Sequence, residues 1–432
     1  MKKFFLFVAL YIYAVSSHAT NGYFMIGYGA KSIGMAGSGV ATAEDTLIGA
    51  LNPAGLSSIE NGIDVGIRAI GAQRNGSIDC RGIFACNSIV SDRSSRTVFF
   101  IPNFGWKRSI SDNIDVGVSV YGNGGINTTY GRAFYRETIA RIMGGSPGSP
   151  GFPRTGKLGI DFSQLFIAPT MSYRLSETQT LGISPIFSLQ RFSTRGFELF
   201  STLSSDPTSL TGRGTDYNVG GGVRLGWQGQ VHSMLRLGAQ YTSRIWTGKA
   251  EKYSGLLANG GEFDAPSHWT VGMTWLPTSR VKVNFDYQRI LWASIDSIGN
   301  AGPTAAELGG IISPSRRLGA KNSMGFGWKD QSVFKLGINF AATPKLTLRA
   351  GWNHGDSQIP NRETLINIVA PATVNDNITA GASWKLSDSE LSLAYMHGLR
   401  KTNRDHQTNL FGASARTSIN QFGLDLSWAK HF

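Results

Sequence analysis

Apolar and polar residues alternate with period two in the last segment of the chain, and this pattern limits its fold more than any other feature. One face carries Phe422, Leu424, Leu426, Trp428 and Phe432, interrupted only by Lys430, and the other carries Gln421, Gly423, Asp425, Ser427 and His431. A period of two is typical of a β-strand with one apolar and one polar environment. The same alternation recurs in segment after segment from about residue 62 onward.

Fourteen segments are predicted as strands on this basis. They lie near residues 62–73, 95–108, 112–125, 160–174, 178–195, 214–228, 232–247, 266–276, 279–297, 326–342, 345–355, 372–387, 389–400 and 417–432. A soluble β-sandwich also alternates, so the connections decide between the two folds. They switch between short turns, such as 276–278 and 343–345, and long loops, such as 126–159, 196–213 and 298–325, as in transmembrane barrels. We expect an all-β fold, a 14-stranded antiparallel transmembrane barrel over residues 61–432.

The N-terminus looks like a signal for export. Lys2 and Lys3 precede the apolar run 4–15, and Ser17 and Ala19 supply small residues before a cleavage point, which predicts a signal peptide at residues 1–19. The run is too short for a membrane-spanning helix and no later segment is comparable, so an exported membrane protein of this kind must cross with a closed barrel. We expect the outer membrane of a Gram-negative bacterium, with insertion by the barrel-assembly machinery at a C-terminal strand that closes on Phe432.

Charge and cysteine content exclude some classes of function. The net charge is +13, but the basic residues are spread singly along the chain, which fits outer-membrane lipid, lipopolysaccharide or an anionic substrate better than nucleic acid. Cys80 and Cys86 predict a disulfide in an oxidising compartment. The seven histidines show no paired spacing, so we expect no metal and no cofactor.

Residues 20–60 are rich in glycine and in buried-type apolar residues, and a 14-stranded barrel is too wide for its wall side chains to fill. This segment is therefore predicted to plug the lumen. Its motifs 34–41, Glu44-Asp45 and Asn52-Pro53-Ala54-Gly55-Leu56 resemble the N-terminal hatch of the FadL/TodX family of outer-membrane channels. Residues 266–292 and 349–395 are similar to later strands of that family. The alternative for Asn52-Pro53 alone is an ordinary turn.

The resemblance implies a monomeric barrel whose hatch blocks the lumen, with hydrophobic ligand entering from outside and leaving sideways through the wall. In the family, a kink in the third strand accompanies the sideways exit. The matching positions here are Gly122, Asn123, Gly124 and Gly125, where glycines interrupt a strand ladder easily, although they equally suit the start of a loop.

Three long loops carry more apolar residues than exposed loops need, and these are the predicted ligand contacts. They are Phe134, Ile139 and Ile142; Phe197, Leu199, Phe200 and Leu203; and Tyr253, Leu256, Leu257 and Phe263. By resemblance, loops 196–213 and 248–265 form the family's outer capture groove. The alternative is that these residues pack together as a rigid cap.

A carboxylate ligand also needs a cation, and four candidates lie on polar strand faces, where they can equally pair with Asp286 or Asp425: Arg236, Lys282, Lys335 and Arg349. Residues 144–148 match Gly-x-Ser-x-Gly, but Pro147 has no N–H for an oxyanion and no strand precedes the motif, so we expect no enzyme. The leading hypothesis is passive uptake of long-chain fatty acids. The alternatives are uptake of aromatic or aliphatic hydrocarbons, and a general porin or surface adhesin.

Overall fold

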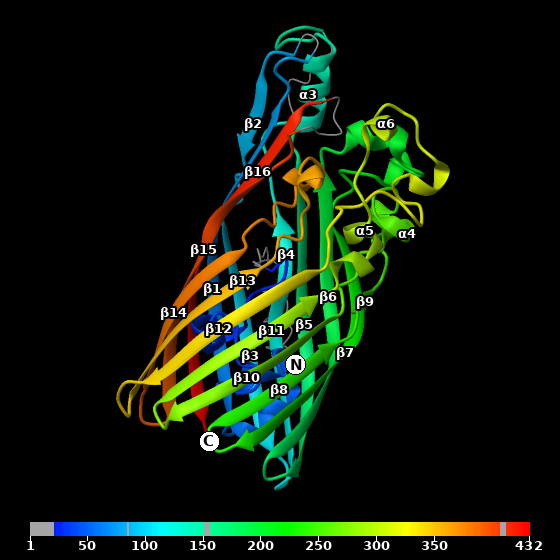
Figure 1. Ribbon diagram of the computed structural model, residues 1–432. Helices are drawn as coiled ribbons and strands as arrows, with labels where there is room; N and C mark the ends of the chain where they lie inside the picture. The colour runs from blue at the N-terminus through cyan, green and yellow to red at the C-terminus, as the bar shows by residue number, and fades with distance from the viewer. Residues whose placement is uncertain (1–20, 84–85, 151–155, 407–411) are drawn as a thin grey trace.

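The computed structural model describes residues 21–83, 86–150, 156–406 and 412–432, so the expected signal peptide, residues 1–19, lies outside the described residues. Among them, sixteen strands form one sheet, and two of these, β2 (Ile89–Arg93) and β9 (Trp246–Thr247), only extend the edges of β1 and β7. The remaining fourteen close into a ring because β16 pairs with β1, from Gly62 opposite His431 to Asp79 opposite Ser414. The predicted 14-stranded antiparallel barrel is confirmed (Figure 1).

The fourteen strands of the ring follow one another in chain order. They are β1 (Gly62–Asp79), β3 (Val98–Ser109), β4 (Ile114–Asn127), β5 (Gly159–Ser176), β6 (Gln179–Arg195), β7 (Asp216–His232), β8 (Leu235–Thr242), β10 (His268–Thr278), β11 (Val281–Ile290), β12 (Gln331–Ala341), β13 (Leu346–Gly355), β14 (Asp376–Lys385), β15 (Ser389–Arg404) and β16 (Ser414–His431).

Several predicted strands were too long, including those expected at 326–342 and 372–387, and two others show a clear cause. The strand expected at 279–297 ends at Ile290, because the chain turns into the short helices η6 (Trp292–Ser294) and α5 (Asp296–Gly299). The strand expected at 232–247 is broken at Ser243, whose backbone N–H bonds Val223 while its hydroxyl bonds the next carbonyl. The sequence also gave no sign of β2, which is short and does not alternate between apolar and polar residues.

The outer wall is apolar and the inner wall polar, as the alternation in β16 predicts. Phe422, Leu424 and Leu426 are 45–48% exposed on the outside, whereas Gln421 and Asp425 are buried inside. The short turns lie at one end of the barrel and the long loops at the other (Figure 1). We call these the turn end and the loop end, and the loop end faces the cell exterior. No described helix has the length and apolarity needed to span a membrane.

The hatch segment lies inside the barrel, where almost every residue from Asn21 to Leu56 is buried. It folds into α2 (Gly29–Gly34) and the 3-10 helices η1 (Thr46–Ala50) and η2 (Pro53–Ser58). α2 packs against β13 to β16, and η1 and η2 pack against β4 to β7, so the segment touches opposite sides of the wall.

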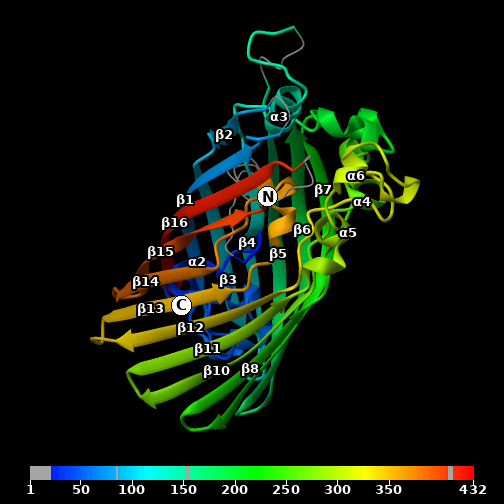
Figure 2. The same ribbon diagram turned by 45° about the horizontal axis from the view of Figure 1, so that its top comes forward.

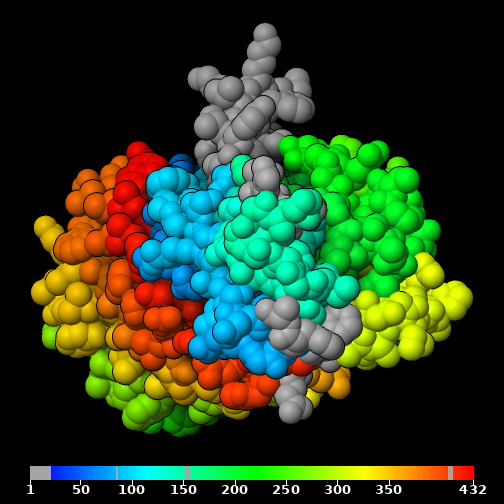
Figure 3. Space-filling model, turned by 90° about the horizontal axis from the view of Figure 1, so that it is seen from above, coloured from blue at the N-terminus to red at the C-terminus, as the bar shows by residue number. Residues whose placement is uncertain are grey.

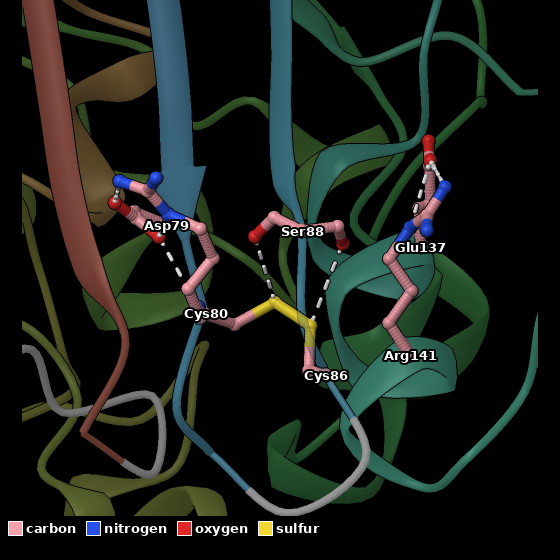
Figure 4. Close-up of a disulfide and its surroundings, with 7 residues drawn as sticks. Asp79, Cys80, Cys86, Ser88, Glu137 and Arg141 are labelled. Carbon is pink, nitrogen blue, oxygen red and sulfur yellow. Dashed lines mark hydrogen bonds and ion pairs between the residues drawn. A yellow bond between two sulfur atoms is a disulfide. The ribbon is translucent and has the colours of Figure 1, made fainter.

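Short helices and loops cap the loop end. α3 (Phe134–Ile142) packs against β1 and β2, and α4 (Ala258–Gly261), α5 and α6 (Ala305–Leu308) lie across the mouth from it (Figures 2 and 3). Cys80 and Cys86 form a disulfide at the tip of the β1–β2 hairpin, with Ser88 contacting both sulfurs (Figure 4). The crosslink closes this hairpin beside α3.

Candidate functional site

A narrow apolar cleft lies among the loops at the loop end, and we call it the loop cleft. Its free volume is about 40 Å³. Its lining is Ile160, Phe192, Thr194, Phe197, Phe200, Leu256, Leu257, Ser297, Pro303, Leu318, Met324, Gly325, Phe326 and Ile366. An apolar cavity of about 150 Å³ holds one benzene molecule. The cleft must therefore widen by side-chain movement before it holds a hydrophobic ligand.

The structure brings four of the predicted ligand contacts together in this cleft: Phe197, Phe200, Leu256 and Leu257. The other seven do not line it. Phe134, Ile142, Leu203, Tyr253 and Phe263 are buried, and Ile139 and Leu199 are half-buried against the same core, as a rigid cap requires.

Sequence reasoning missed the rest of the lining. Ile160 and Phe192 belong to β5 and β6, where their inward direction follows from the alternation. Leu318, Met324 and Phe326 come from the long loop after α5, and no period marks them, although apolar residues in a glycine-rich loop are a usable signal.

A column of buried aromatic rings runs from the loop cleft toward the hatch. Phe192 lies 5.6 Å from Phe263 between ring centroids, and Phe263 lies 4.7 Å from Phe162. Phe162 meets Tyr23 of the hatch at 5.1 Å, and Tyr23 meets Trp292 at 4.7 Å. These rings are in edge or tilted contact, so the column is closely packed between the loop cleft and the hatch.

The column ends at a second space between hatch and wall, which we call the hatch cavity. It has a free volume of about 30 Å³, and its wall side includes His268, Asp286 and Lys335. The Asp286 carboxylate accepts hydrogen bonds from the backbone N–H groups of Gly39 and Val40, at 2.8 and 3.0 Å. Two backbone N–H groups of the hatch therefore stabilise this wall carboxylate.

Lys335 lies opposite Asp286 in the strand register and is 4% exposed. Its Nζ donates only two long hydrogen bonds, to the carbonyls of Ile26 at 3.5 Å and Gly37 at 3.4 Å. Within the described residues no carboxylate reaches this ammonium to within 4.0 Å. It is thus a buried cation with unused hydrogen-bonding capacity.

Two of the other candidate cations are already paired with the hatch. Glu44 accepts from Lys282 at 2.9 Å and from Arg349 at 3.1 Å. Burial disfavours its charge, but Lys282 and Arg349 outweigh that effect and lower the pKa of Glu44 to about 2. Asp45 next to it behaves in the opposite way, because burial and the carboxylate of Asp64 raise its pKa to about 7.

The Asn52-Pro53-Ala54-Gly55 segment docks on the wall rather than forming an isolated turn. The Asn52 amide nitrogen donates to the carbonyls of Val40 at 2.7 Å and Trp227 at 3.0 Å, and its oxygen accepts from the N–H of Ala54 at 3.1 Å. The wall makes room with glycine, since a Cβ at Gly226 would lie 2.0 Å from that amide oxygen. Asn52 therefore connects two parts of the hatch to β7.

The ladder between β3 and β4 stops half-way up the barrel. It runs from Ser109 opposite Asp115 only to Phe104 opposite Val120. Beyond that point, among the described strands, Val98–Asn103 of β3 pair only with β1. Tyr121–Asn127 of β4 pair only with β5, and this ladder has a bulge between Gly122 and Gly124. We call this discontinuity the β3–β4 seam.

The hatch occupies the free edge of β4 at the seam. The N–H of Met25 donates to the carbonyl of Asn123 and the N–H of Gly125 to that of Tyr23, both at 3.1 Å. A Cβ at Gly124 would lie 1.8 Å from the Tyr23 carbonyl oxygen, so only glycine permits this approach. Three of the four predicted kink residues, Asn123, Gly124 and Gly125, thus contact the same hatch segment that enters the aromatic column.

Metal chemistry has no candidate here, since the described residues contain no group of three histidine, cysteine, aspartate or glutamate side chains placed to hold an ion. The Gly144–Gly148 motif follows the helix α3 instead of preceding one. This order is the reverse of a nucleophile elbow.

The chain is similar to solved outer-membrane channels over nearly its whole length. The toluene transporter TodX of P. putida shares 18% identity, covers 94% of this chain and 99% of its own, and superposes with a TM-score of 0.67. A FadL homologue from Pseudomonas aeruginosa gives 12% identity, 95% and 100% coverage and a TM-score of 0.67. The toluene transporter TbuX of Ralstonia pickettii shares 17% identity, covers 94% of this chain and 99% of its own, and superposes with a TM-score of 0.62.

At these identities the solved structures establish the fold alone. No curated protein matches the chain. The model of the outer membrane protein transport protein family (OMPP1/FadL/TodX) matches residues 12–416. Since this match spans nearly all of the barrel and hatch just described, the chain belongs to the OMPP1/FadL/TodX family of outer membrane transport proteins.

Proposed function

We propose that this protein is a passive channel for hydrophobic molecules, and that long-chain fatty acids are its main cargo. The loop cleft captures the ligand, movement of the aromatic column admits it to the hatch cavity, and the β3–β4 seam releases it sideways into the membrane. Lys335 is the observation that favours fatty acids over hydrocarbons. A buried ammonium with free donors at the inner end of an apolar route suits an alkyl chain that ends in a carboxylate.

The electrostatics of the hatch cavity support this choice. Asp286 is occupied by two backbone N–H groups of the hatch, and Lys282 and Arg349 are occupied by Glu44. Asp286 attracts the Lys335 ammonium across the ladder but, among the described residues, forms no ion pair with it, so the ammonium keeps donors for an incoming carboxylate. A bound carboxylate replaces two long contacts with a charge-assisted hydrogen bond, which is about twice as strong as a neutral one.

Uptake of aromatic hydrocarbons is the second candidate. Its support is the loop cleft, whose lining is almost wholly apolar and includes three phenylalanines, together with the similarity to the toluene transporters TodX and TbuX. A hydrocarbon has no group to pair with Lys335, so its passage does not need that side chain.

The test measures uptake of radiolabelled oleate and toluene by cells that lack their own channel and express either the wild type or Lys335→Met. We expect oleate uptake to fall about 10-fold or more, since a hydrogen bond to a charged group contributes about 1.5–3 kcal/mol, and toluene uptake to stay unchanged. Lys345→Met, an exposed lysine in a turn, is the matched control. Toluene uptake without oleate uptake moves the assignment to hydrocarbons.

Absence of both activities rejects hydrophobic transport and favours a general porin or an adhesin. Deleting residues 22–50 separates those two cases, because the lumen of a porin blocked by a hatch then conducts small polar solutes. An adhesin offers no polar path through the barrel, so its conductance stays unchanged after the same deletion.

A further inference from the structure

Four arginines gather on the outer wall of the barrel at the loop end, away from both cavities. They are Arg93 of β2, Arg400 and Arg404 of β15, and Arg416 of β16, and all four are exposed. These strands lie side by side through β1 where the wall extends beyond the rest of the barrel (Figure 1). We call this surface the arginine patch.

The strand register fixes the height of the patch on the wall. On β16 the outward residues change from apolar to polar between Phe422 and Asn420. On β1 the same change occurs between Gly71, which pairs with Phe422, and Gln73, which pairs with Asn420. Arg416 follows two outward positions further toward the loop end, and Arg93 pairs with Asn75 between these levels. The patch therefore begins where the lipid-facing band ends.

The patch also borders that band directly on β15. Leu399 is 44% exposed on the outer wall, and the next residue is Arg400, at the bulge where the β15–β16 register shifts. Phe422 beside it is 48% exposed. One continuous surface thus offers apolar side chains at the level of acyl chains and guanidinium groups at the level of lipid headgroups.

Among the described residues, no arginine of the patch forms an ion pair with a carboxylate, and Asp79 attracts Arg404 only at longer range. Arg404 lies directly opposite Arg416 in the ladder, an arrangement that destabilises a sheet unless an anion lies between the two charges. In the part of the chain that the structure describes, the guanidinium groups of Arg400, Arg404 and Arg416 form no hydrogen bond or ion pair. Among the described residues, the guanidinium group of Arg93 donates only to the neutral side chain of Gln73.

The nearby acids do not neutralise these arginines. Asp92 accepts from the backbone N–H groups of Arg93 and Gly131, at 2.7 Å each. Asp79 is held by Arg81 through two guanidinium hydrogen bonds, at 2.9 and 2.7 Å, and a backbone one at 3.1 Å, and it attracts Arg404 only at longer range. Between the arginines lies a polar groove of about 410 Å³, lined by Asn75, Gly76, three serines, Asp92 and three of the four arginines. Asp92 is the one acid among the described residues of this lining, and both of its oxygens already accept backbone N–H groups.

We propose that the arginine patch binds the phosphate groups of lipopolysaccharide in the outer leaflet. Guanidinium forks match phosphate oxygens in bidentate geometry, and the groove supplies hydroxyl and amide donors beside them. The acyl chains of the same lipid lie along Leu399, Phe422 and Leu424 below. The site orients the barrel and its extended β1–β2 hairpin in the outer leaflet, independently of what the channel transports.

The test is native mass spectrometry of the full-length protein titrated with bisphosphorylated lipid A, the phosphorylated anchor of lipopolysaccharide. The variant Arg400→Gln/Arg416→Gln removes two patch charges, and Arg108→Gln/Arg280→Gln removes two exposed arginines at the turn end as the matched control. We expect the dissociation constant to rise at least tenfold in the patch variant and less than twofold in the control.

Further arms identify the lipid that is bound. Lipid A without phosphates is expected to bind the wild type at least tenfold more weakly, and phosphatidylglycerol or inorganic phosphate is expected not to displace bound lipid A. Equal retention of lipid A by the patch variant, equal binding of the dephosphorylated lipid, or displacement by equimolar phosphatidylglycerol overturns the proposal. If the glutamine variant does not fold, Arg400→Lys/Arg416→Lys keeps the charge but not the fork, and wild-type affinity in that variant also overturns it.

Discussion

Replacing Asn52 with alanine tests whether the hatch is held in the barrel by a few identifiable hydrogen bonds. Asn52 is fully buried, and its amide donates to the carbonyls of Val40 and Trp227 and accepts from Ala54. Loss of the cap on η2 costs about 1 kcal/mol. Buried polar partners left unsatisfied cost about 1–3 kcal/mol more. The Val40 carbonyl still accepts a hydrogen bond from Gln228 at 3.0 Å, so its share of the cost lies in the lower half of this range.

The total, about 2–4 kcal/mol, multiplies the population of the undocked hatch by about 30 to 700, at about 1.4 kcal/mol for each factor of ten. Hydrogen exchange of the variant in lipid nanodiscs measures this, with faster exchange expected at residues 21–60 and unchanged exchange in the barrel strands. Asn113→Ala, at an exposed turn, is the control. Wild-type exchange in the hatch, or equal acceleration in the strands, refutes the reasoning.

Three further outcomes follow from the same contacts. Glu44 contributes free energy to hatch docking above its unfolded pKa near 4.5, and this contribution is lost as pH falls toward 2. Asp45 acts in the opposite direction: because its pKa is raised to about 7 in the docked hatch, docking weakens as pH rises from about 4 to 7. Exchange protection of the hatch is therefore expected to peak near pH 4 to 5, and a monotonic profile contradicts this. Gly124→Val is expected to expel the hatch backbone from the seam and raise single-channel conductance in planar bilayers. Cys80→Ser/Cys86→Ser is expected to lower the thermal stability of the β1–β2 hairpin by about 2–4 kcal/mol, measured by proteolysis of that hairpin, with no change in uptake.

The barrel was predictable because each strand has a two-sided environment. Leu424 must face lipid and Asp425 the lumen, so the local sequence predicts the strand and its two faces with little help from distant residues, although not where the strand ends. The short strand β2 was missed for the same reason, because it projects beyond the membrane and neither of its faces needs to be apolar.

The candidate site was less predictable because tertiary neighbours decide which of several equivalent residues is used. Lys282 and Lys335 both lie on polar strand faces, but only Lys282 reaches Glu44 of the hatch. Phe200 and Leu203 lie one turn apart in the same loop, yet Phe200 lines the loop cleft and Leu203 is buried beside it. No local pattern distinguishes the members of either pair.

The fit between hatch and wall indicates which part of the hatch moves. A Cβ on any of a ring of inward-facing glycines would lie 2.0–2.4 Å from a hatch atom between Ser38 and Ala54, as at Gly105, Gly182, Gly226, Gly238 and Gly337. A body cradled so closely on several strands cannot shift without many simultaneous losses. The stretch from Asn21 to Met25 is held differently, by backbone pairing to the edge of β4 at the seam and by aromatic contacts. We therefore expect movement of this stretch, rather than of the whole hatch, to open the aromatic column and the seam together.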